Sequence, residues 1–390
     1  MRAEANPYTP NAGARPPALV GRDDELEAFK VLLARLLRGY TDQSMLITGL
    51  RGVGKTVLLT RFQELAREGG WTTVEAEITK NSDFGDRMAN FARRALLQLA
   101  PRDRWKERAA RAAAVLRSFQ LTLRSDGSVT AGFDVEPAAG LADSGHLDED
   151  LTDVFVALGE AAQEQRSGVV FLIDEVQFLA APEFEALIAA MHKTVQRQLP
   201  ITLVGAGLPQ LPRLAGEAKS YAERLFKFPQ IGRLSAEQAR IALAEPANRL
   251  GVEFEPDALA AVVDFTEGYP YFLQEYGNTL WNQVEDSPVT AADVSSAQAA
   301  VEAKLDGGFF RVRAERMSEL EQRYLRAMAE LGPEPQAAKD VAELLGRTSQ
   351  QVGPIRARLV DKGLLYTAGH GLAAFTVPQF DRFMRRTYSL

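Results

Sequence analysis

The hydrophobic residues of this chain form short runs in its first half and follow a helical spacing in its second half. Short apolar or β-rich segments predict buried strands, and they begin at Ser44, Thr72, Val169, Ile201 and Leu225. Segments with apolar residues three and four positions apart lie between them and predict helices. Strands that alternate with helices form a parallel sheet with helices on both faces. The pattern therefore predicts an α/β domain with a five-stranded parallel sheet over residues 18–232.

The β pattern ends near Leu234, and helical patterns alone follow. They cover residues 235–250, 256–266, 269–284 and 291–304. Such a run of helices without strands predicts an all-α lid domain over residues 233–308. Gly307 and Gly308 at its end predict a hinge, because glycine permits a wide range of backbone conformations.

The C-terminal residues 309–390 predict a winged helix-turn-helix domain. Two helices are expected over Ser318–Leu331 and Gln336–Leu345. Thr348 and Gln351 have the spacing of a capping box, which predicts the start of a third helix. Because proline disrupts a helix interior, the regular part of this helix is expected to begin near Pro354. A hairpin with its turn at residues 369–371 follows, which completes the three helices and wing of this motif.

Two further segments have patterns of their own. Residues 1–17 are rich in proline, alanine and asparagine, which predicts a flexible N-terminal arm. Residues 119–135 alternate apolar and polar side chains around Asp126-Gly127. Because Asp-Gly is a preferred hairpin turn, this alternation predicts a β-hairpin insertion.

Composition narrows the classes of protein that remain. The chain is 46% hydrophobic and 25% charged, as in soluble globular proteins, and no stretch reaches the about 18 apolar residues of a membrane span. There is no cysteine, which excludes thiolate chemistry, and the three histidines are scattered, which argues against a histidine metal cluster. We expect a cytoplasmic protein with no membrane partner.

The net charge of the whole chain is −7, so any site that binds nucleic acid must be a local basic region. Residues 318–390 carry ten Lys/Arg and eight Asp/Glu and are therefore mildly basic, with a net charge of +2.

A phosphate-binding loop stands at the end of the first predicted strand. Gly49-x4-Gly54-Lys55-Thr56 lies between an apolar strand and an amphipathic helix, as this motif requires. Its glycines let backbone N–H groups approach an anion at the helix N-terminus. Lys55 is expected to reach the β and γ phosphates, and the Thr56 hydroxyl to bind Mg²⁺.

Two carboxylates follow the apolar strand that begins at Val169. Asp174, at the strand's end, is expected to hold the Mg²⁺ shell, and Glu175 to polarise an attacking water as general base. An acidic helix cap after a core strand gives the same pattern. The phosphate-binding loop in the same chain favours the nucleotide interpretation.

These features together resemble the AAA+ ATPases, and within them the origin-recognition initiators and the STAND signalling ATPases. Residues 19–26, Leu-Val-Gly-Arg-Asp-Asp-Glu-Leu, are similar to the adenine-side entry motif, Gly268-Tyr-Pro270 to the Gly-x-Pro of STAND lids, and the winged helix follows the lid as in initiators. The resemblance implies ATP or ADP with Mg²⁺ as ligands. It implies nucleotide contacts from Val20, Gly21, Arg22, Gly49, Arg51, Gly52, Val53, Gly54, Lys55, Thr56, Val57 and Pro270.

The chain departs from this family at two positions. Val204-Gly-Ala-Gly207 stands where the family has a polar sensor at the end of the fourth strand, and the lid shows no sensor arginine. Both departures imply slow hydrolysis. Arg224 matches the arginine-finger position, which implies a nucleotide-dependent homo-oligomer; a surface arginine paired with Glu223 is the alternative.

The sequence leaves two hypotheses for the output of nucleotide binding. In the first, the winged helix binds double-stranded DNA, with Ser349, Gln350, Gln351, Arg356 and Arg358 as groove or phosphate contacts. In the second, nucleotide state controls assembly with a protein partner, as in a signalling or chaperone-type switch. The fold alone does not choose between them.

Overall fold

The structure is a computed structural model that describes residues 2–79, 83–101, 105–123, 133 and 135–390. Its first part is built around a parallel sheet with the strand order β2-β3-β4-β1-β5. The strands are β1 (Ser44–Thr48), β2 (Thr72–Glu77), β3 (Val169–Asp174), β4 (Ile201–Gly207) and β5 (Phe226–Lys227). The five-stranded parallel sheet predicted from the sequence is thereby confirmed.

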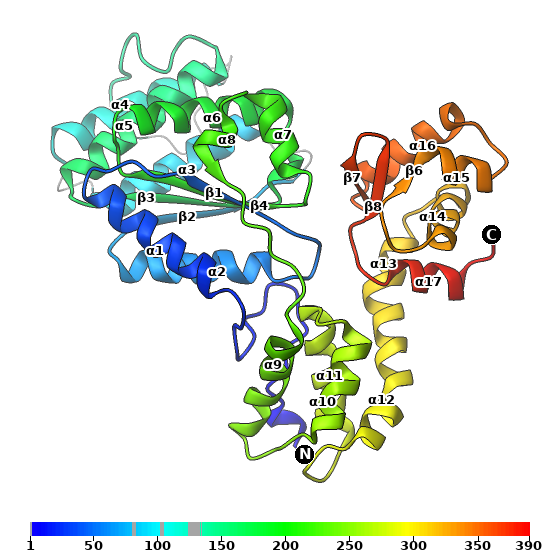
Figure 1. Ribbon diagram of the computed structural model, residues 1–390. Helices are drawn as coiled ribbons and strands as arrows, with labels where there is room; N and C mark the ends of the chain where they lie inside the picture. The colour runs from blue at the N-terminus through cyan, green and yellow to red at the C-terminus, as the bar shows by residue number, and fades with distance from the viewer. Residues whose placement is uncertain (1, 80–82, 102–104, 124–132, 134) are drawn as a thin grey trace.

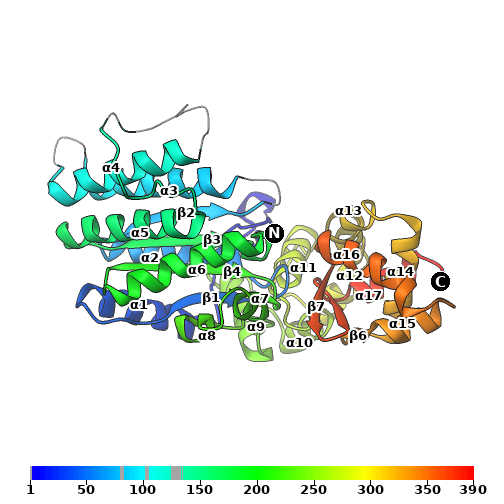
Figure 2. The same ribbon diagram turned by 90° about the horizontal axis from the view of Figure 1, so that it is seen from above.

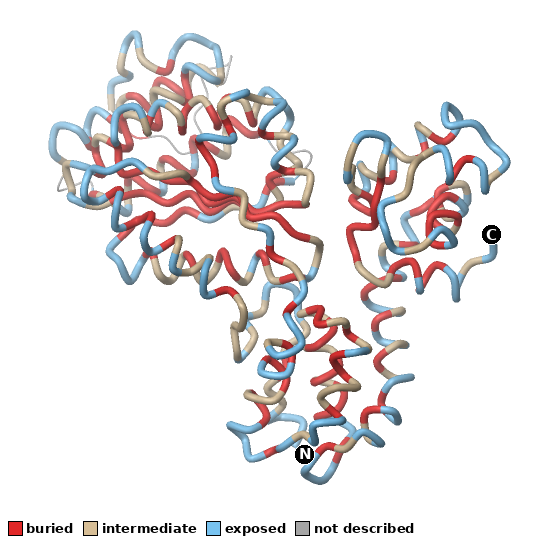
Figure 3. Tube along the Cα trace, viewed as in Figure 1, coloured by how far each residue is buried: buried red, intermediate tan, exposed pale blue. Residues whose placement is uncertain are grey.

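Helices cover both faces of this sheet (Figure 1). Helices α1 (Asp23–Leu37) and α2 (Lys55–Glu68) lie on one face, where Met45 and Ile47 point. The opposite face, where Leu46 points, is covered by α3 (Phe84–Leu99), α4 (Glu107–Thr122), α5 (Leu147–Glu164) and α6 (Ala181–Gln196). The short elements η3 (Val176–Phe178), α7 (Leu211–Ala218) and α8 (Ala222–Leu225) complete this part. Because alternate residues of a strand enter opposite cores, the strands are buried throughout most of their length (Figure 3).

Strand register determines which loops meet at one edge of the sheet. Strand β4 lies between β1 and β3, with Val204 opposite both Met45 and Leu172. The three strands run parallel, so the loops that follow Thr48, Asp174 and Gly207 emerge side by side. Ligands of open α/β sheets bind at this carboxyl edge.

The segment predicted to form a β-hairpin differs in part from that expectation. Phe119 and the residues up to Thr122 are the last turn of α4, and Phe119 is buried against the helices of this face. The rest of the predicted hairpin, around Asp126-Gly127, lies mostly outside the described residues. Its first four positions therefore follow a helical rather than an alternating pattern.

The second part is helical, and its last helix continues without a break into a longer helical rod. It contains α9 (Ala236–Asn248), α10 (Pro256–Thr266), α11 (Pro270–Gln283) and α12 (Ala291–Lys304). Helix α12 continues through the π-helix η4 (Leu305–Phe310) into α13 (Arg311–Ala314). The predicted hinge at Gly307-Gly308 is therefore a widened helical turn, in which Phe309 and Phe310 are buried.

The third part has the helices and small antiparallel sheet of a winged helix. It comprises α14 (Glu319–Leu331), β6 (Gln336–Ala337), α15 (Ala338–Leu344), α16 (Ser349–Asp361), β7 (Leu365–Gly369), β8 (Leu372–Phe375) and α17 (Phe380–Thr387), with sheet order β6-β8-β7. Helix α16 begins at Ser349, five residues earlier than Pro354. Thr348 and Gln351 form the predicted capping box, which satisfies the first-turn donors and starts the helix before the proline.

The three parts share one hydrophobic core that extends from α1 and α2 through the lid into the winged helix. Seen from above, the lid lies between the sheet and the winged helix (Figure 2). Residues 2–17 differ from the flexible arm that their composition predicts. They include η1 (Ala3–Ala5) and lie along the lid, with Tyr8 buried. The domain boundaries proposed above stay predictions.

Candidate functional site

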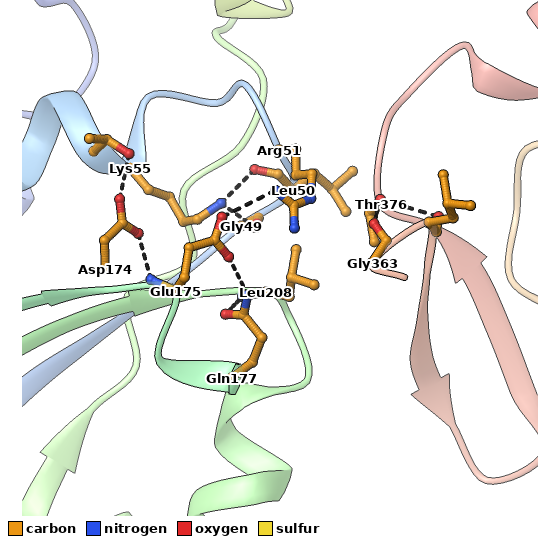
Figure 4. A network of polar contacts seen from close by, with 12 residues as sticks. Gly49, Leu50, Arg51, Lys55, Asp174, Glu175, Gln177, Leu208, Gly363 and Thr376 are labelled. Carbon is orange, nitrogen blue, oxygen red and sulfur yellow. Dashed lines mark hydrogen bonds and ion pairs between the residues drawn. The ribbon is translucent and has the colours of Figure 1, made fainter. Parts of the chain in front are cut away.

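The loop between β1 and α2 is shaped around the side chain of Lys55. Gly52 and Gly54 adopt φ angles of 84° and 94°, a left-handed conformation that favours glycine. The Lys55 ammonium is buried and donates to the carbonyls of Gly49 at 2.9 Å and Leu50 at 2.8 Å (Figure 4). Burial lowers the pKa of Lys55 to about 8, with Glu175 and Asp174 acting in the opposite direction. A buried cation that has only carbonyl dipoles as direct partners is well prepared to take an anion.

Thr56 and Asp174 form a direct link between the loop and β3. The Thr56 hydroxyl donates to Asp174 Oδ2 at 2.5 Å, and the backbone N–H of Glu175 donates to Oδ1 at 2.8 Å. Burial raises the pKa of Asp174, and these two hydrogen bonds offset part of that effect. A hydroxyl and a carboxylate are hard oxygen donors, so this pair fits Mg²⁺.

Glu175 stands beside this pair in a left-handed conformation, with φ of 56°. Such conformations are uncommon outside glycine and concentrate at functional sites. Its carboxylate accepts from Arg51 Nη1 at 3.1 Å and from the side-chain amide of Gln177. Arg51, which sequence analysis placed among the nucleotide contacts, thus directs its side chain to the carboxylate in this structure (Figure 4).

Gln177 is a residue that sequence analysis missed. Its side-chain carbonyl accepts from the backbone N–H of Leu208 at 3.1 Å, just beyond the end of β4. A Cβ on Gly207 would lie 2.6 Å from the same oxygen, so glycine at this position makes room for Gln177. A polar side chain from η3 therefore lies beside the end of β4, where the strand itself carries none. The glycine that ends β4 is the one signal in the sequence for this arrangement.

A cavity of about 650 Å³ opens at this edge of the sheet. Most of the predicted nucleotide and metal residues line it, namely Val20, Arg22, Arg51, Gly52, Val53, Gly54, Lys55, Thr56, Val57, Asp174, Glu175 and Pro270. Gly21 and Gly49 stand behind the wall, against Gln238 and the carbonyl of Ile231. The structure thus brings the predicted residues of four separate segments to one cavity.

Arg22 lines the cavity, but its side chain is largely taken up by backbone carbonyls. It is 6% exposed, and its guanidinium donates to the carbonyls of Val53 at 3.1 Å and Gly232 at 2.9 Å. Burial lowers the pKa of Arg22. Arg22 therefore ties the entry motif to the phosphate-binding loop and to the segment that leads into the lid.

Another wall of the cavity comes from Tyr271, next to the predicted contact Pro270, and from the helical rod and winged helix, which sequence analysis did not associate with the site. Tyr271 stacks on Phe309 with ring centroids 4.5 Å apart, and the Arg313 guanidinium lies over the Phe309 ring at 4.3 Å. Arg313, Arg316 and Lys362 bring cationic side chains to this wall. No pattern in the sequence marks them, because their place depends on how the helical rod and winged helix pack beside the sheet.

Arg224 lies away from this cavity. Strand β5 pairs with β1 so that Phe226 is opposite Ser44, the first residue of β1. Arg224 precedes Phe226 and therefore lies near the amino edge of the sheet, whereas the phosphate-binding loop lies at the carboxyl edge. Its side chain is exposed, and its backbone carbonyl accepts from the Gln43 amide at 3.0 Å.

The five predicted DNA contacts fall into two groups on α16. Ser349, Gln350 and Gln351 are exposed on its first turn. Arg356 is half-buried and donates to the carbonyl of Leu372 at 2.9 Å, and Arg358 pairs with the buried Glu321 at 3.5 Å. Both arginines therefore have partners within the winged helix in this structure.

The strand order, loop and carboxylate pair define a phosphate-loop nucleotide-binding domain. Comparison with protein families agrees, because residues 18–204 match the AAA ATPase domain. The chain therefore carries an AAA ATPase domain. Residues 307–384 match a domain of unknown function, DUF8462.

Solved structures with a similar fold extend over almost the whole chain. The Walker-type ATPase PABY2304 of Pyrococcus abyssi is 14% identical, with 95% of this chain and 97% of that chain covered and a TM-score of 0.58. At this identity the likeness concerns the fold alone. The Holliday junction branch migration motor RuvB of Thermotoga maritima (16% identity, 96% and 99% covered, TM-score 0.46) and the Orc1 protein of Aeropyrum pernix in complex with DNA (18%, 95% and 94%, 0.44) also match.

No curated protein matches the sequence. Among the described residues, no helix combines the length and apolar character that a membrane span needs.

Proposed function

We propose that this chain binds ATP together with Mg²⁺ in the cavity at the carboxyl edge of the sheet and hydrolyses it. The observation that carries the proposal is the meeting of the buried Lys55 ammonium with the 2.5 Å pair of Thr56 and Asp174. Lys55 exchanges its two backbone carbonyl partners for phosphate oxygens, and the loop N–H groups bind the same oxygens. Thr56 and Asp174 hold the metal ion, which supplies neutralisation of the phosphate charge.

Glu175 is the general base in this proposal. It lies next to the metal-binding carboxylate, and its oxygen atoms face Arg51 and Gln177. To accept a proton from water, the carboxylate must exchange at least one of these partners. Gln177 then orients the carboxylate as a positioning residue. Because an ion-paired base must first be freed, this arrangement supports slow hydrolysis.

The test of nucleotide binding compares Lys55→Ala with the wild type by titration calorimetry. Loss of a buried charge that faces the phosphates weakens ATP binding by about two orders of magnitude. Lys30→Ala is the matched control, because this lysine is exposed on α1 and pairs with Glu27. Equal ATP affinity of Lys55→Ala and wild type would overturn the assignment.

We propose further that nucleotide binding controls how the winged helix binds double-stranded DNA. The exposed Ser349, Gln350 and Gln351 support this, since polar side chains at the start of such a helix reach base edges in the major groove. In a shift assay over a range of salt concentrations, phosphate contacts give an affinity that falls with salt. Gln350→Ala is expected to weaken such binding, and Gln298→Ala on the lid serves as its control.

A protein partner is the second candidate for this output. The observation that favours it is the pairing of Arg356 with the carbonyl of Leu372 and of Arg358 with Glu321, so both arginines of α16 have partners within the winged helix. Absence of salt-dependent DNA binding, together with nucleotide-dependent capture of a purified partner, favours this alternative.

A further inference from the structure

The N-terminal segment runs from the lid to the ATPase domain and lines the cavity on its way. Its first anchor is on the lid. Tyr8 is 2% exposed, and its hydroxyl donates to the carbonyl of Leu243 at 2.6 Å. Asn6 donates to the carbonyl of Asn278 at 3.1 Å, and Asn278 donates back to the carbonyl of Tyr8 at the same distance. The backbone of Thr9 donates to Gln274 at 3.1 Å.

The shape of the lid is adapted to this anchor. A Cβ on Gly277 would lie 2.6 Å from the Tyr8 ring, so glycine in α11 makes the space that the ring fills. The Tyr8 ring also meets Trp281 edge to face, and the Trp281 indole donates to the carbonyl of Arg2 at 2.8 Å. The Tyr8 ring and hydroxyl are buried, and the hydrogen bonds around them are specific, unlike those of a loosely attached arm.

The second anchor is on α2, the helix that follows the phosphate-binding loop. Arg15 pairs with both carboxylate oxygens of Glu64, at 3.0 and 3.1 Å. Thr9 donates to the carbonyl of Arg15 at 3.3 Å, which closes residues 9–15 into a loop. Within this loop a Cβ on Gly13 would lie 3.6 Å from the methyl group of Thr56, so the loop passes directly beside the predicted metal ligand.

The chemistry of the loop identifies the part of a ligand that it covers. Residues 9–14 read Thr-Pro-Asn-Ala-Gly-Ala, carry no charge and line the cavity. Across the cavity the lid presents Leu234, Ala242 and Leu273. An uncharged and largely apolar wall suits a nucleobase and ribose, whereas the phosphates have their partners in the loop at residues 49–56.

We propose that residues 6–16, here named the strap, form part of the nucleotide-binding site and enclose the nucleoside half of the bound nucleotide. This inference rests on the proposed function above. Because the strap is fixed to the lid and to α2, a nucleotide enclosed beneath it leaves only after one anchor opens. The strap therefore strengthens binding of the nucleoside and slows nucleotide release.

The test compares a ligand that has a nucleoside with one that lacks it. Tyr8→Ala opens the lid anchor and Arg15→Ala the anchor on α2, and each is titrated with MgATP and with Mg-tripolyphosphate. ATP affinity is expected to fall about tenfold in Tyr8→Ala, which loses a buried anchor, and about threefold in Arg15→Ala, whose ion pair with Glu64 is partly exposed, while tripolyphosphate affinity stays within about twofold. ATP should dissociate faster by a similar factor in a chase experiment. Arg213→Ala, which removes an exposed pair with Glu217 on α7, is the control and should change neither affinity.

The outcomes separate this proposal from the one on which it rests. Wild-type ATP affinity in both strap variants, or equal loss of both ligands, overturns the strap while ATP binding stands. If the wild type binds neither ligand, both proposals fall. Tyr8→Phe removes the hydroxyl alone and keeps the ring, so it tests the anchor if Tyr8→Ala does not fold.

Hydrogen exchange tests the strap in the wild type. Exchange of the backbone amides of residues 9–15 should slow with MgATP and not with tripolyphosphate. Unchanged exchange with MgATP counts against the strap.

Discussion

The guanidinium of Arg51 and the carboxylate of Glu175 form an ion pair at 3.1 Å between the phosphate-binding loop and the end of β3. The backbone N–H of Arg51 also donates to the carbonyl of Thr376 in the winged helix, at 3.0 Å. A Cβ on Gly363 would lie 3.0 Å from the same guanidinium. One residue thus contacts the proposed base and the winged helix together (Figure 4).

This relationship predicts that Arg51→Met hydrolyses ATP faster than the wild type. Methionine keeps an unbranched side chain and removes the charge that holds Glu175. A partly exposed ion pair is worth about 1 kcal/mol, so its loss should raise kcat by about fivefold. Steady-state ATPase assays at saturating MgATP measure the change. Arg213→Met, which breaks an exposed pair with Glu217 on α7, is the control. A slower Arg51→Met enzyme indicates that Arg51 contacts the reacting phosphate instead.

Glu175→Gln should retain ATP binding and lose hydrolysis. The amide keeps the shape of the carboxylate but accepts no proton from water, and the loss of a general base costs about 100- to 10,000-fold in rate. Calorimetry and phosphate-release assays on the same preparation separate binding from turnover. Equal hydrolysis by variant and wild type leaves Glu175 as a structural partner of Arg51 and Gln177 without a role in chemistry.

The sequence predicts those parts of the site that depend on local pattern. The strands before Gly49 and Asp174 are apolar runs, and parallel strands place their carboxyl ends at one edge. The meeting of Lys55, Thr56, Asp174 and Glu175 follows from these two facts alone. The match of residues 18–204 to the AAA ATPase domain agrees with this interpretation.

The remaining walls of the cavity depend on packing between segments that are distant in sequence. Gln177 reaches the end of β4 through a contact with Leu208, and Arg313 reaches the cavity because the lid continues into a helical rod. The N-terminal segment has the composition of a flexible arm, yet Tyr8 is buried where Gly277 leaves space. Such complementary pairs leave no periodic signal in a single sequence.

The ATP affinity of the protein should fall as pH rises above about 8. In the nucleotide-free protein burial lowers the pKa of Lys55 to about 8, and phosphate favours its charged form. Below this pH the ammonium is present in the free protein and Lys55 contributes little pH dependence. Above it, binding requires uptake of a proton, and affinity declines by up to about tenfold per pH unit. Calorimetry at pH 7, 8 and 9 in buffers of different ionisation enthalpy measures both the affinity and the proton uptake.

The Lys55→Arg variant is the control for this pH dependence. Arginine stays protonated throughout this range, so whatever ATP affinity it retains should change less between pH 7 and 9. An identical pH profile in wild type and Lys55→Arg assigns the titration to another group.

Arg224 is expected to act on a neighbouring subunit. It lies near the amino edge of its own sheet, away from the phosphate-binding loop of the same chain, and a cation opposite the γ-phosphate stabilises charge in the transition state. We therefore expect ATP to promote self-association, with specific activity that increases with protein concentration. Arg224→Ala should bind ATP normally and hydrolyse it about 1,000-fold more slowly, the lower range for loss of an arginine finger.

A mixing experiment tests whether the site is shared between subunits. Lys55→Ala lacks the phosphate-binding cation but keeps Arg224, whereas Arg224→Ala has the opposite defect. When the two variants are mixed, the loop of one subunit can meet the arginine of the other, and part of the activity should return. Arg213→Ala, another exposed arginine, should show wild-type activity alone. Specific activity that is independent of concentration, with no recovery on mixing, contradicts a role for Arg224 in trans.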